Sequence, residues 1–431
     1  MEKTLRLYQN DPYEKSCDSR VLTMVTDASE IAALGGKRDQ GTACLVFDRT
    51  IFFPEGGGQP SDSGTISGES ATFELLYVFE KDDIVYHQFN INTEDKLANT
   101  PESLSALIGT TLHCELDWSR RFSHMQRHCG EHILSAAFYE LFGGVNRGFH
   151  MGADYMTIDI SLEDDPDFTQ MTDDMVAAAE WESNRMIWDN LPVTTRYFKH
   201  REEAEGLPMR KALTIEEDIV LVCVGDENKA SGCVACCGTH PARTGEVGLI
   251  KVYGWENYKG MTRITFDAGA GALENYRTQG NLIKDLCKHY SSDAETLMEK
   301  IRLREQKSNG IRQDLYELKQ AYLAERAREL SEDLAGQGRV LVKKYELLKT
   351  DDLLALSKLL PDLSGKLVAL VSTKENTLIL LSQGTPDCNK IIKDNAAIWR
   401  GKGGGRANSA RAMFPGAEDM ECFLDYINKA F

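Results

Sequence analysis

Residues 128–132 read H-C-G-E-H, within a longer run in which apolar residues recur every three or four positions. This spacing predicts a helix over residues 119–142, and the Gly143-Gly144 pair that follows predicts its end. Histidines four positions apart project from the same face of a helix, so both imidazoles can reach a single ion. The helix is therefore predicted to carry one half of a metal site.

The other half of the site is predicted at residues 236–240, which read C-C-G-T-H and follow a predicted strand over residues 219–224. The glycine allows the loop to fold back so that the cysteine and the histidine converge. Three imidazoles and one thiolate are typical of a tetrahedral zinc site. We therefore predict one zinc ion per chain, with the ligands His128, His132, Cys236 and His240.

The sequence leaves the chemistry of this zinc ion open. One thiolate, three neutral imidazoles and Zn2+ sum to a charge of +1, which leaves Lewis-acid character to polarise an ester carbonyl. A zinc ion with four protein ligands is nevertheless normally structural. Residues 128–132 also spell H-x-x-E-H, the signature of inverted zinc peptidases, in which Glu131 would be the general base. A peptidase requires a further Glu ligand and leaves Cys236 and His240 without a role.

The predicted fold class is α+β with several domains. Residues 1–95 contain short apolar runs separated by glycine and proline turns, which favour a small β-barrel. Residues 96–272 are predicted to form an α/β domain that contains the zinc site, and residues 273–335 a long helical connector. Its apolar seam is compatible with an antiparallel hairpin that turns near Gly310 or with an intersubunit coiled coil. Residues 336–431 return to an α/β pattern with a Gly-rich segment.

The composition is that of an ordinary globular protein, since 27% of the 431 residues are charged and 42% belong to the hydrophobic set. These values exclude a collagen, a mucin-like stalk and a mainly disordered chain. No apolar run reaches the length of a signal peptide or a membrane span, so we expect a cytoplasmic protein without a membrane partner.

The eleven cysteines are unevenly distributed. Cys233, Cys236 and Cys237 fall within five positions, which suits a metal or reactive site better than a disulfide framework. Seven others are predicted to be small core residues. They are Cys17, Cys44, Cys114, Cys223, Cys287, Cys388 and Cys422.

A glycine-rich stretch, F-P-E-G-G-G-Q-P-S-D-S-G, occupies residues 53–64. Three successive glycines let a ligand approach the backbone closely and leave N–H groups free for an anion or a hydroxyl. A glycine-rich hairpin turn without a ligand explains the same composition.

Along the chain, the glycine-rich stretch comes first, then H-x3-H, then C-x-G-T-H followed by R-T-G-E-V-G-L-I-K. In this order the motifs resemble the editing half of alanyl-tRNA synthetases, and they are similar to the free-standing alanyl-tRNA editing proteins of the AlaX family. The C-terminal stretch Arg400-Gly-Lys402-Gly-Gly-Gly-Arg406 is followed by A-N-S-A-R-A. It resembles the Gly-rich, DHHA1-like module of alanyl-tRNA synthetases and DHH-type phosphoesterases. Together these features resemble the long form of the AlaX family.

The resemblance implies a trans-editing hydrolase that deacylates tRNA-Ala carrying serine, and also glycine, with zinc bound by the four residues above. Such a second sieve is physically useful because a pocket for alanine rejects glycine and serine only weakly. Gln59 and Glu131 are the candidate catalytic residues, although a zinc ion that only orients the ester would leave no side chain as a strong general base. The implied substrate-binding residues are Gly56, Gly57, Gly58, Gln59, Asp62 and Thr239.

The C-terminal module implies contacts with the acceptor stem and 3′ end of tRNA-Ala, and a homodimer. The candidate tRNA-binding residues are Arg400, Lys402, Gly403, Gly404, Gly405, Arg406 and Arg411. Two departures from the family pattern bear on the choice between serine and glycine. Position 129 is Cys where the family often has Thr, and residues 145–150 lack the Gln that the synthetases usually carry.

The formal net charge of −18 is unusual for a protein that binds nucleic acid. Basic residues nevertheless cluster in the C-terminal module, beside the first half-site (Arg120, Arg121 and Arg127) and at residues 196–201. These clusters predict that tRNA binding is confined to a few patches. The alternative functions are an H-x-x-E-H zinc peptidase and a non-catalytic, zinc-stabilised RNA-binding protein.

Overall fold

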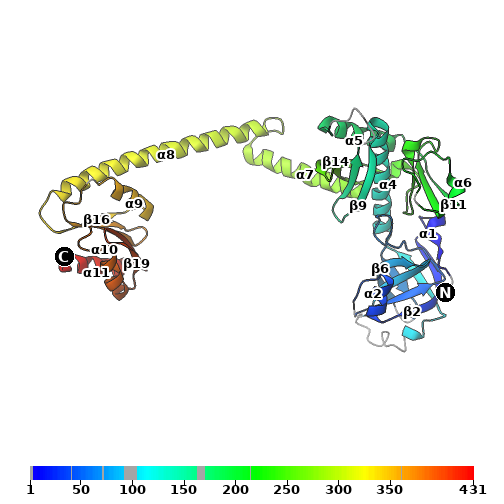
Figure 1. Cartoon of the computed structure of the whole chain (residues 1–431), viewed down its shortest axis with the longest axis horizontal. Coiled ribbons are helices and arrows are strands. Elements are labelled where there is room, and N and C mark those ends of the chain that lie inside the picture. Colours follow the sequence, from blue (N-terminus) through cyan, green and yellow to red (C-terminus); the bar gives the residue numbers. More distant parts are fainter. Residues whose placement is uncertain are drawn as a thin grey trace. The chain divides into compact units, whose positions relative to one another are not determined.

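The computed structural model describes residues 3–39, 41–69, 72–91, 104–162, 170–213, 215–360 and 362–431. The chain forms two compact units, Met1–Ile283 and Lys284–Phe431 (Figure 1). Among the residues that are described, no helix has both the length and the apolar character needed to cross a membrane.

The first unit begins with a closed β-barrel, as predicted (Figure 1). Aromatic and aliphatic side chains from alternate strand positions, such as Phe47, Phe73 and Phe89, fill its interior. The barrel order is β2 (Ser16–Val25), β3 (Thr42–Phe47), β7 (Ile84–Asn90), β6 (Thr72–Lys81), β5 (Gly64–Ser67) and β8 (Thr111–Leu116). The short elements around it are β1 (Leu5–Arg6), α1 (Leu7–Asn10), α2 (Ala28–Leu34) and β4 (Arg49–Thr50).

The barrel extends farther along the chain than the boundary predicted after residue 95. That boundary falls in residues 92–103, outside the described part of the chain. Strand β8 follows this segment and pairs with both β2 and β5, so it closes the barrel. Residues up to Leu116 therefore belong to the barrel rather than to the domain that contains the predicted zinc site.

Helix α4 (Trp118–Phe142) follows the barrel directly and confirms the helix predicted over residues 119–142. Asp117 caps its first turn and Gly143, in the left-handed conformation, ends it. The helix packs with α5 (Asp173–Trp188) against a four-stranded sheet, and this interface is the largest apolar core of the unit. The sheet order is β14 (Ile250–Tyr258), β15 (Met261–Ala268), β10 (Met156–Ser161) and β9 (Val145–Met151).

A smaller antiparallel sheet contributes the second half-site. Its strands are β11 (Val193–His200), β12 (Glu217–Val224) and β13 (Cys233–Ala235), with α6 (Arg201–Ala204), η1 (Ala230–Gly232) and η2 (Thr244–Val247) in the connections. Cys223 and Cys233 stand opposite each other on β12 and β13 and form a disulfide. Cys223 is buried in the core, as predicted, but the disulfide shows that the prediction of a metal or reactive site was wrong for Cys233. The prediction that Cys422 is a core residue was also wrong, because its side chain is exposed.

The helical connector differs from the predicted hairpin. Helix α7 (Gly269–Tyr290) ends before the turn at 291–296, and α8 (Leu297–Leu334) then runs without interruption through Gly310. The predicted turn near Gly310 is wrong, because one glycine costs a helix interior only about 1 kcal/mol. The first half of α8 exposes apolar side chains, among them Ile311 and Leu315, and the intersubunit coiled coil stays a prediction.

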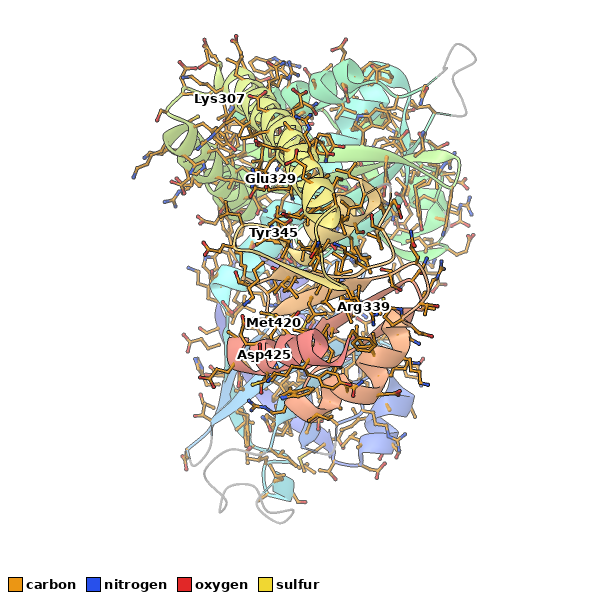
Figure 2. The ribbon with its side chains drawn as sticks, turned by 90° about the vertical axis from the view of Figure 1, so that its left-hand side faces the viewer. Lys307, Glu329, Arg339, Tyr345, Met420 and Asp425 are labelled. Atoms are coloured by element: carbon orange, nitrogen blue, oxygen red, sulfur yellow. A yellow bond between two sulfur atoms is a disulfide. The ribbon has the colours of Figure 1, made fainter. Side chains whose placement is uncertain are left out.

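The second unit is an α/β domain. The last turns of α8 pack on its sheet through Leu323 and Leu330 (Figure 2). The strand order is β16 (Val340–Tyr345), β17 (Leu367–Ser372), β18 (Thr377–Leu381), β20 (Ser409–Met413) and β19 (Lys402–Arg406). The helical elements are α9 (Thr350–Lys358), α10 (Cys388–Asn395), η3 (Ala396–Trp399) and α11 (Ala417–Ala430).

The Gly-rich segment of the second unit is a strand rather than a loop. Residues 402–406 form β19, which pairs with β20 at the edge of the sheet. A Cβ atom on Gly403 would lie 1.9 Å from the carbonyl oxygen of Arg411, and one on Gly405 would lie 2.4 Å from that of Ser409. Close approach of the two strands thus explains these two glycines without any ligand.

Candidate metal centre and pocket

The structure brings the four predicted zinc ligands together. His128 and His132 lie one turn apart on α4, and Cys236 and His240 come from the loop after β13. Their ligand atoms all lie within 4.8 Å of one another. The Sγ atom of Cys236 lies 3.3 Å from His128 Nε2 and 3.4 Å from His240 Nε2. We call these four residues the metal cluster.

The geometry and chemistry of the metal cluster fit zinc. Bonds of ~2.0–2.3 Å in a tetrahedron place ligand atoms about 3.3–3.7 Å apart, which agrees with the distances around Cys236. The Nε2 atom of His132 is buried without a hydrogen-bond partner. Burial lowers the pKa of His128 to about 3 and that of His240 well below its ordinary value, so both rings are neutral. Burial also raises the pKa of the Cys236 thiol, and a bound cation favours its thiolate form.

Gln59 fixes the orientation of His128 from the glycine-rich stretch of the barrel. Its Oε1 atom lies 2.9 Å from His128 Nδ1 and accepts a hydrogen bond from the backbone N–H of Thr239 at 3.1 Å. Its Nε2 atom donates to Thr239 Oγ1 at 2.9 Å. With Nδ1 held by Gln59, Nε2 of His128 is the nitrogen that faces the cluster. Gly238 leaves room for this ring, since a Cβ there would lie 2.2 Å from it.

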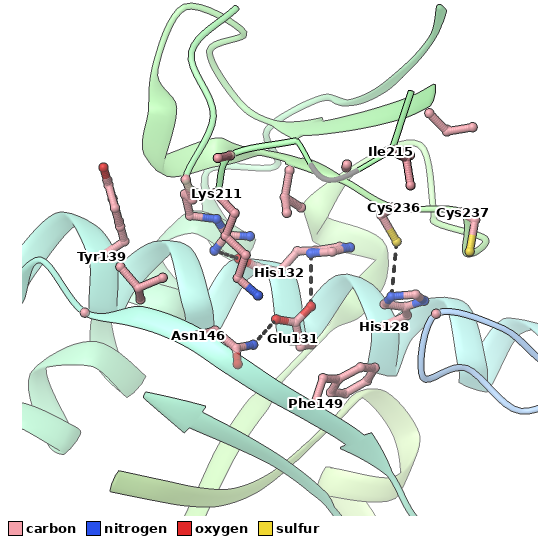
Figure 3. Close-up of a pocket in the computed structure, with 18 of the residues that line it drawn as sticks. His128, Glu131, His132, Tyr139, Asn146, Phe149, Lys211, Ile215, Cys236 and Cys237 are labelled. Carbon is pink, nitrogen blue, oxygen red and sulfur yellow. Dashed lines mark hydrogen bonds and ion pairs between the residues drawn. The ribbon is translucent and has the colours of Figure 1, made fainter. Parts of the chain in front are cut away.

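Glu131 contacts the second histidine of the helix as an ion pair (Figure 3). Its Oε2 atom lies 3.0 Å from His132 Nδ1, which leaves Nε2 of that ring to face the cluster. Its Oε1 atom accepts hydrogen bonds from Ser135 and Asn146, both at 2.7 Å. Burial raises the pKa of Glu131, but His132 and Arg210 more than offset this and hold it well below its usual range.

A cavity of about 410 Å³ opens above the metal cluster. This volume is within the usual range of small-ligand pockets. His128, Glu131, His132 and Cys236 line it together with residues of several other segments (Figure 3). Among these are Gly57, Tyr139, Asn146, Phe149, Arg210, Lys211, Ile215 and Cys237. We call this cavity the pocket.

The other predicted substrate-binding residues lie in different places. Of the set, only Gly57 is among the residues that line the pocket. Gln59 and Thr239 are buried behind His128. Asp62 is buried, and its carboxylate pairs with Arg121 and accepts from the backbone N–H of Phe53. This placement gives Asp62 a structural role in the barrel and does not support a contact with substrate.

Two arginines of the predicted tRNA-binding patches are buried in ion pairs, and a third arginine is paired at the surface. Arg121 is fully buried in its ion pair with Asp62, and Arg127 is buried with Asp267 at 2.7 Å. In the C-terminal unit, Arg400 forms a bidentate pair with Asp419. The other predicted basic residues there are exposed. They are Lys402, Arg406 and Arg411.

Sequence reasoning did not find the residues that support and surround the metal cluster. Ser135 and Asn146 hold Glu131, and Arg210 and Lys211 line the pocket. No motif contains them, because each reaches the site through the fold rather than through its spacing from a ligand. The only available signal was that residues 145–150 depart from the pattern of the synthetases.

Three family models match parts of the chain. The model of class II (A) tRNA synthetases matches residues 2–117, and that of the threonyl and alanyl tRNA synthetase second additional domain matches residues 222–265. The DHHA1 domain matches residues 337–431. The first match ends where the barrel meets α4, and the second includes the Cys236 half-site.

Two kinds of curated protein are similar to this chain, an alanyl-tRNA editing protein and alanine–tRNA ligases. The alanyl-tRNA editing protein AlaX-L of Pyrococcus horikoshii is 27% identical over 416 residues, which are 94% of this chain and 93% of that protein. The alanine–tRNA ligase of Methanobrevibacter smithii is 26% identical over 91% of this chain and 43% of the ligase. That of Halobacterium salinarum is 30% identical over 65% of this chain and 27% of the ligase. The chain is thus similar along most of its length to the alanyl-tRNA editing protein AlaX-L and to a part of alanine–tRNA ligases that is less than half of their length.

Proposed function

We propose that this protein hydrolyses the ester bond between tRNA-Ala and a wrongly attached serine or glycine. The observation that carries the proposal is the metal cluster, whose four ligand atoms lie within 4.8 Å of one another beside a cavity of about 410 Å³. The similarity to the editing protein AlaX-L over 94% of the chain supports the choice of an aminoacyl-tRNA substrate. An ester hydrolase beside a synthetase acts as a second sieve for amino acids that its pocket cannot reject.

The side chains of the site prepare it for this reaction. A bound zinc ion supplies positive charge for the carbonyl or the amino group of the aminoacyl ester. Gln59 and Glu131 hold the imidazoles of His128 and His132 with Nε2 toward the cluster, so the ligands need no rearrangement. Phe149 and other apolar residues line part of the pocket.

The same contacts argue against the zinc peptidase. In the H-x-x-E-H reading Glu131 would have to activate a water, but its carboxylate is buried among Ser135, Asn146 and His132. Cys236 and His240 complete the cluster with both helix histidines, whereas the peptidase would leave them unused. The site thus favours a zinc ion with three imidazoles and one thiolate over a peptidase centre.

We further propose that the C-terminal unit binds the tRNA. The DHHA1 match covers residues 337–431, and the exposed cations Lys402, Arg406 and Arg411 lie on the edge hairpin β19–β20. Arg400 is exposed as well, and its guanidinium is paired with Asp419. Homodimerisation through this part of the chain belongs to the same proposal and is measured by the mass of the protein in solution.

A deacylation assay tests the central proposal. Zinc-loaded protein is expected to release serine from Ser-tRNA-Ala and glycine from Gly-tRNA-Ala, and to leave Ala-tRNA-Ala intact. Cys236→Ala or a chelator is expected to stop the release. Cys422→Ala is the control, because this thiol is exposed and belongs neither to the metal cluster nor to the residues that line the pocket.

The outcomes separate the three classes of function. Binding of Ser-tRNA-Ala by the zinc-loaded protein without any release of serine would refute the hydrolase and identify an RNA-binding protein. Chelator-sensitive cleavage of a peptide library without deacylation would identify a peptidase.

A further inference from the structure

Two cations of the pocket have no place in the proposed chemistry of the metal cluster. Arg210 and Lys211 lie on the loop between α6 and β12, and both line the pocket (Figure 3). Among the described residues, neither forms an ion pair with a carboxylate within 4.0 Å. We call them the cation pair.

The loop that carries the cation pair is held on both sides. The backbone N–H of Arg210 donates to the carbonyl oxygen of Cys233 on β13 at 3.0 Å. Its Nη1 atom donates to the carbonyl oxygen of His132 on α4, also at 3.0 Å. Leu207 and Met209, which precede it, pack against the buried disulfide of β12 and β13. The guanidinium is therefore held against the backbone of His132, a residue of the metal cluster, and its Nε atom is buried without a hydrogen-bond partner.

The carboxylates of the pocket offset the charge of the cation pair only in part. Glu131 already accepts two hydrogen bonds and contacts His132, and Asp218 is paired with Lys199 at 2.6 Å. Burial and the positive charges of Arg210 and Arg147 lower the pKa of Lys211, whereas Glu131 raises it. A bound anion would relieve this repulsion between neighbouring cations.

We infer that Arg210 and Lys211 form a phosphate subsite at the pocket, and that the subsite binds the 5′-phosphate of the nucleotide that carries the amino acid. This inference rests on the proposed function. The ester at the 3′ end and that phosphate are attached to the same ribose, so both can be bound when the ester reaches the metal cluster. An arginine fork and a lysine ammonium are typical ligands of phosphate oxygens.

Small esters test the subsite without the rest of the tRNA. The probes are serine esterified to the 3′ oxygen of adenosine and the same ester of adenosine 5′-monophosphate. The wild-type protein is expected to hydrolyse the phosphate-bearing ester with a kcat/KM about tenfold higher than that of the phosphate-free ester, through a lower KM. A tenfold effect is the size expected from one charge-assisted hydrogen bond to the phosphate. Lys211→Met is expected to remove this tenfold preference and to change hydrolysis of the phosphate-free ester by less than about twofold.

Two further variants separate the subsite from a structural role. Lys307→Met is the matched control, because this exposed lysine lies on α8 and does not line the pocket (Figure 2). Arg210→Lys keeps the charge but loses the fork, and it is expected to retain part of the preference and the full zinc content. An equal loss on both esters in Lys211→Met would refute the subsite, because the lysine would then act on the ester itself. A wild-type protein without any preference for the phosphate would refute it as well.

Binding of adenosine 5′-monophosphate to the zinc-loaded protein keeps the test independent of catalysis. If neither ester is hydrolysed, the proposed function fails, but the subsite still predicts that the monophosphate binds about tenfold more tightly than adenosine. Lys211→Met should abolish that difference. Competition by inorganic phosphate alone would show that the subsite recognises the phosphate group without the nucleoside. Equal affinities of adenosine and adenosine 5′-monophosphate for the wild-type protein would overturn the subsite.

Discussion

Replacement of Glu131 by Gln distinguishes an orienting carboxylate from a general base. In the native protein Oε1 accepts from Ser135 and Asn146 at 2.7 Å each, and Oε2 lies 3.0 Å from His132 Nδ1. The amide keeps its oxygen toward the two donors, so its NH2 group must face Nδ1. That nitrogen carries a proton when Nε2 binds a metal, and two donors then face each other.

The lost contact should weaken the metal site rather than the chemical step. Loss of such a supporting partner typically costs 10- to 100-fold in metal affinity, which corresponds to about 1.4–2.8 kcal/mol. We expect Glu131→Gln to lose zinc at a chelator concentration about 10- to 100-fold lower than the wild type does, and to recover its deacylation rate in excess zinc. Loss of a general base would instead lower kcat by about 10²- to 10⁴-fold at any zinc concentration.

Zinc competition against a chromophoric chelator and deacylation of Ser-tRNA-Ala at saturating zinc measure the two quantities. Glu140→Gln is the matched control, since Glu140 lies on the same helix with an exposed side chain. A Glu131→Gln protein that is fully loaded with zinc but deacylates as poorly as Cys236→Ala would refute the orienting role.

Three further changes test the surroundings of the site. Asp62→Ala leaves the fully buried Arg121 unpaired and should lower the free energy of unfolding in urea by about 3–5 kcal/mol. Asp62→Leu combined with Arg121→Met should lower it by less than the sum of the two single changes. Additive losses would contradict the pairing. Gln59→Ala removes the partner of His128 Nδ1 and should lower zinc affinity about tenfold or more, with an unchanged affinity as the opposing result. Burial lowers the pKa of His87 from 6.5 to about 4, so the unfolded chain binds the proton at a higher pH than the folded protein does. The free energy of unfolding should therefore fall as the pH drops from 6.5 to 4, by about 2 kcal/mol at pH 5. Hydrogen exchange of the barrel should show this loss, and His87→Gln should reduce it.

The parts of the site that the sequence predicts are those that depend on local spacing. Two ligands four positions apart on a helix, or in a loop with a glycine between them, are brought together by backbone geometry alone. The helix that carries His128 and His132 follows from its apolar periodicity, and its end follows from Gly143. The barrel likewise follows from short apolar runs and turn signals, except for the strand β8.

The missed features depend on which segments meet in space. Asp62 lies in a glycine-rich motif, but its role follows from Arg121, which is 59 positions away in the sequence and buried beside it. The disulfide between Cys223 and Cys233 depends on the register of β12 and β13, which composition does not reveal. The helix break at 291–296 rather than at Gly310 shows the weakness of a lone glycine as a signal.

The internal ion pairs also change how the acidic charge of the chain bears on RNA binding. A buried arginine in a carboxylate pair is unavailable to a phosphate, because separating the pair would leave an uncompensated buried charge. Arg121 and Arg127 are removed from the RNA-binding surface in this way, and Arg400 is neutralised at the surface by Asp419. Among the described residues, few of the basic residues in the predicted patches and the pocket lack a carboxylate partner and stay available to a phosphate. They are Arg120 beside the first half-site, Arg210 and Lys211 in the pocket, and Lys402, Arg406 and Arg411 on the edge hairpin. The whole chain carries a net charge of −18, which opposes nonspecific contact with a nucleic acid. Under the proposed function, these few cations therefore favour one placement of the tRNA over general attraction to its backbone.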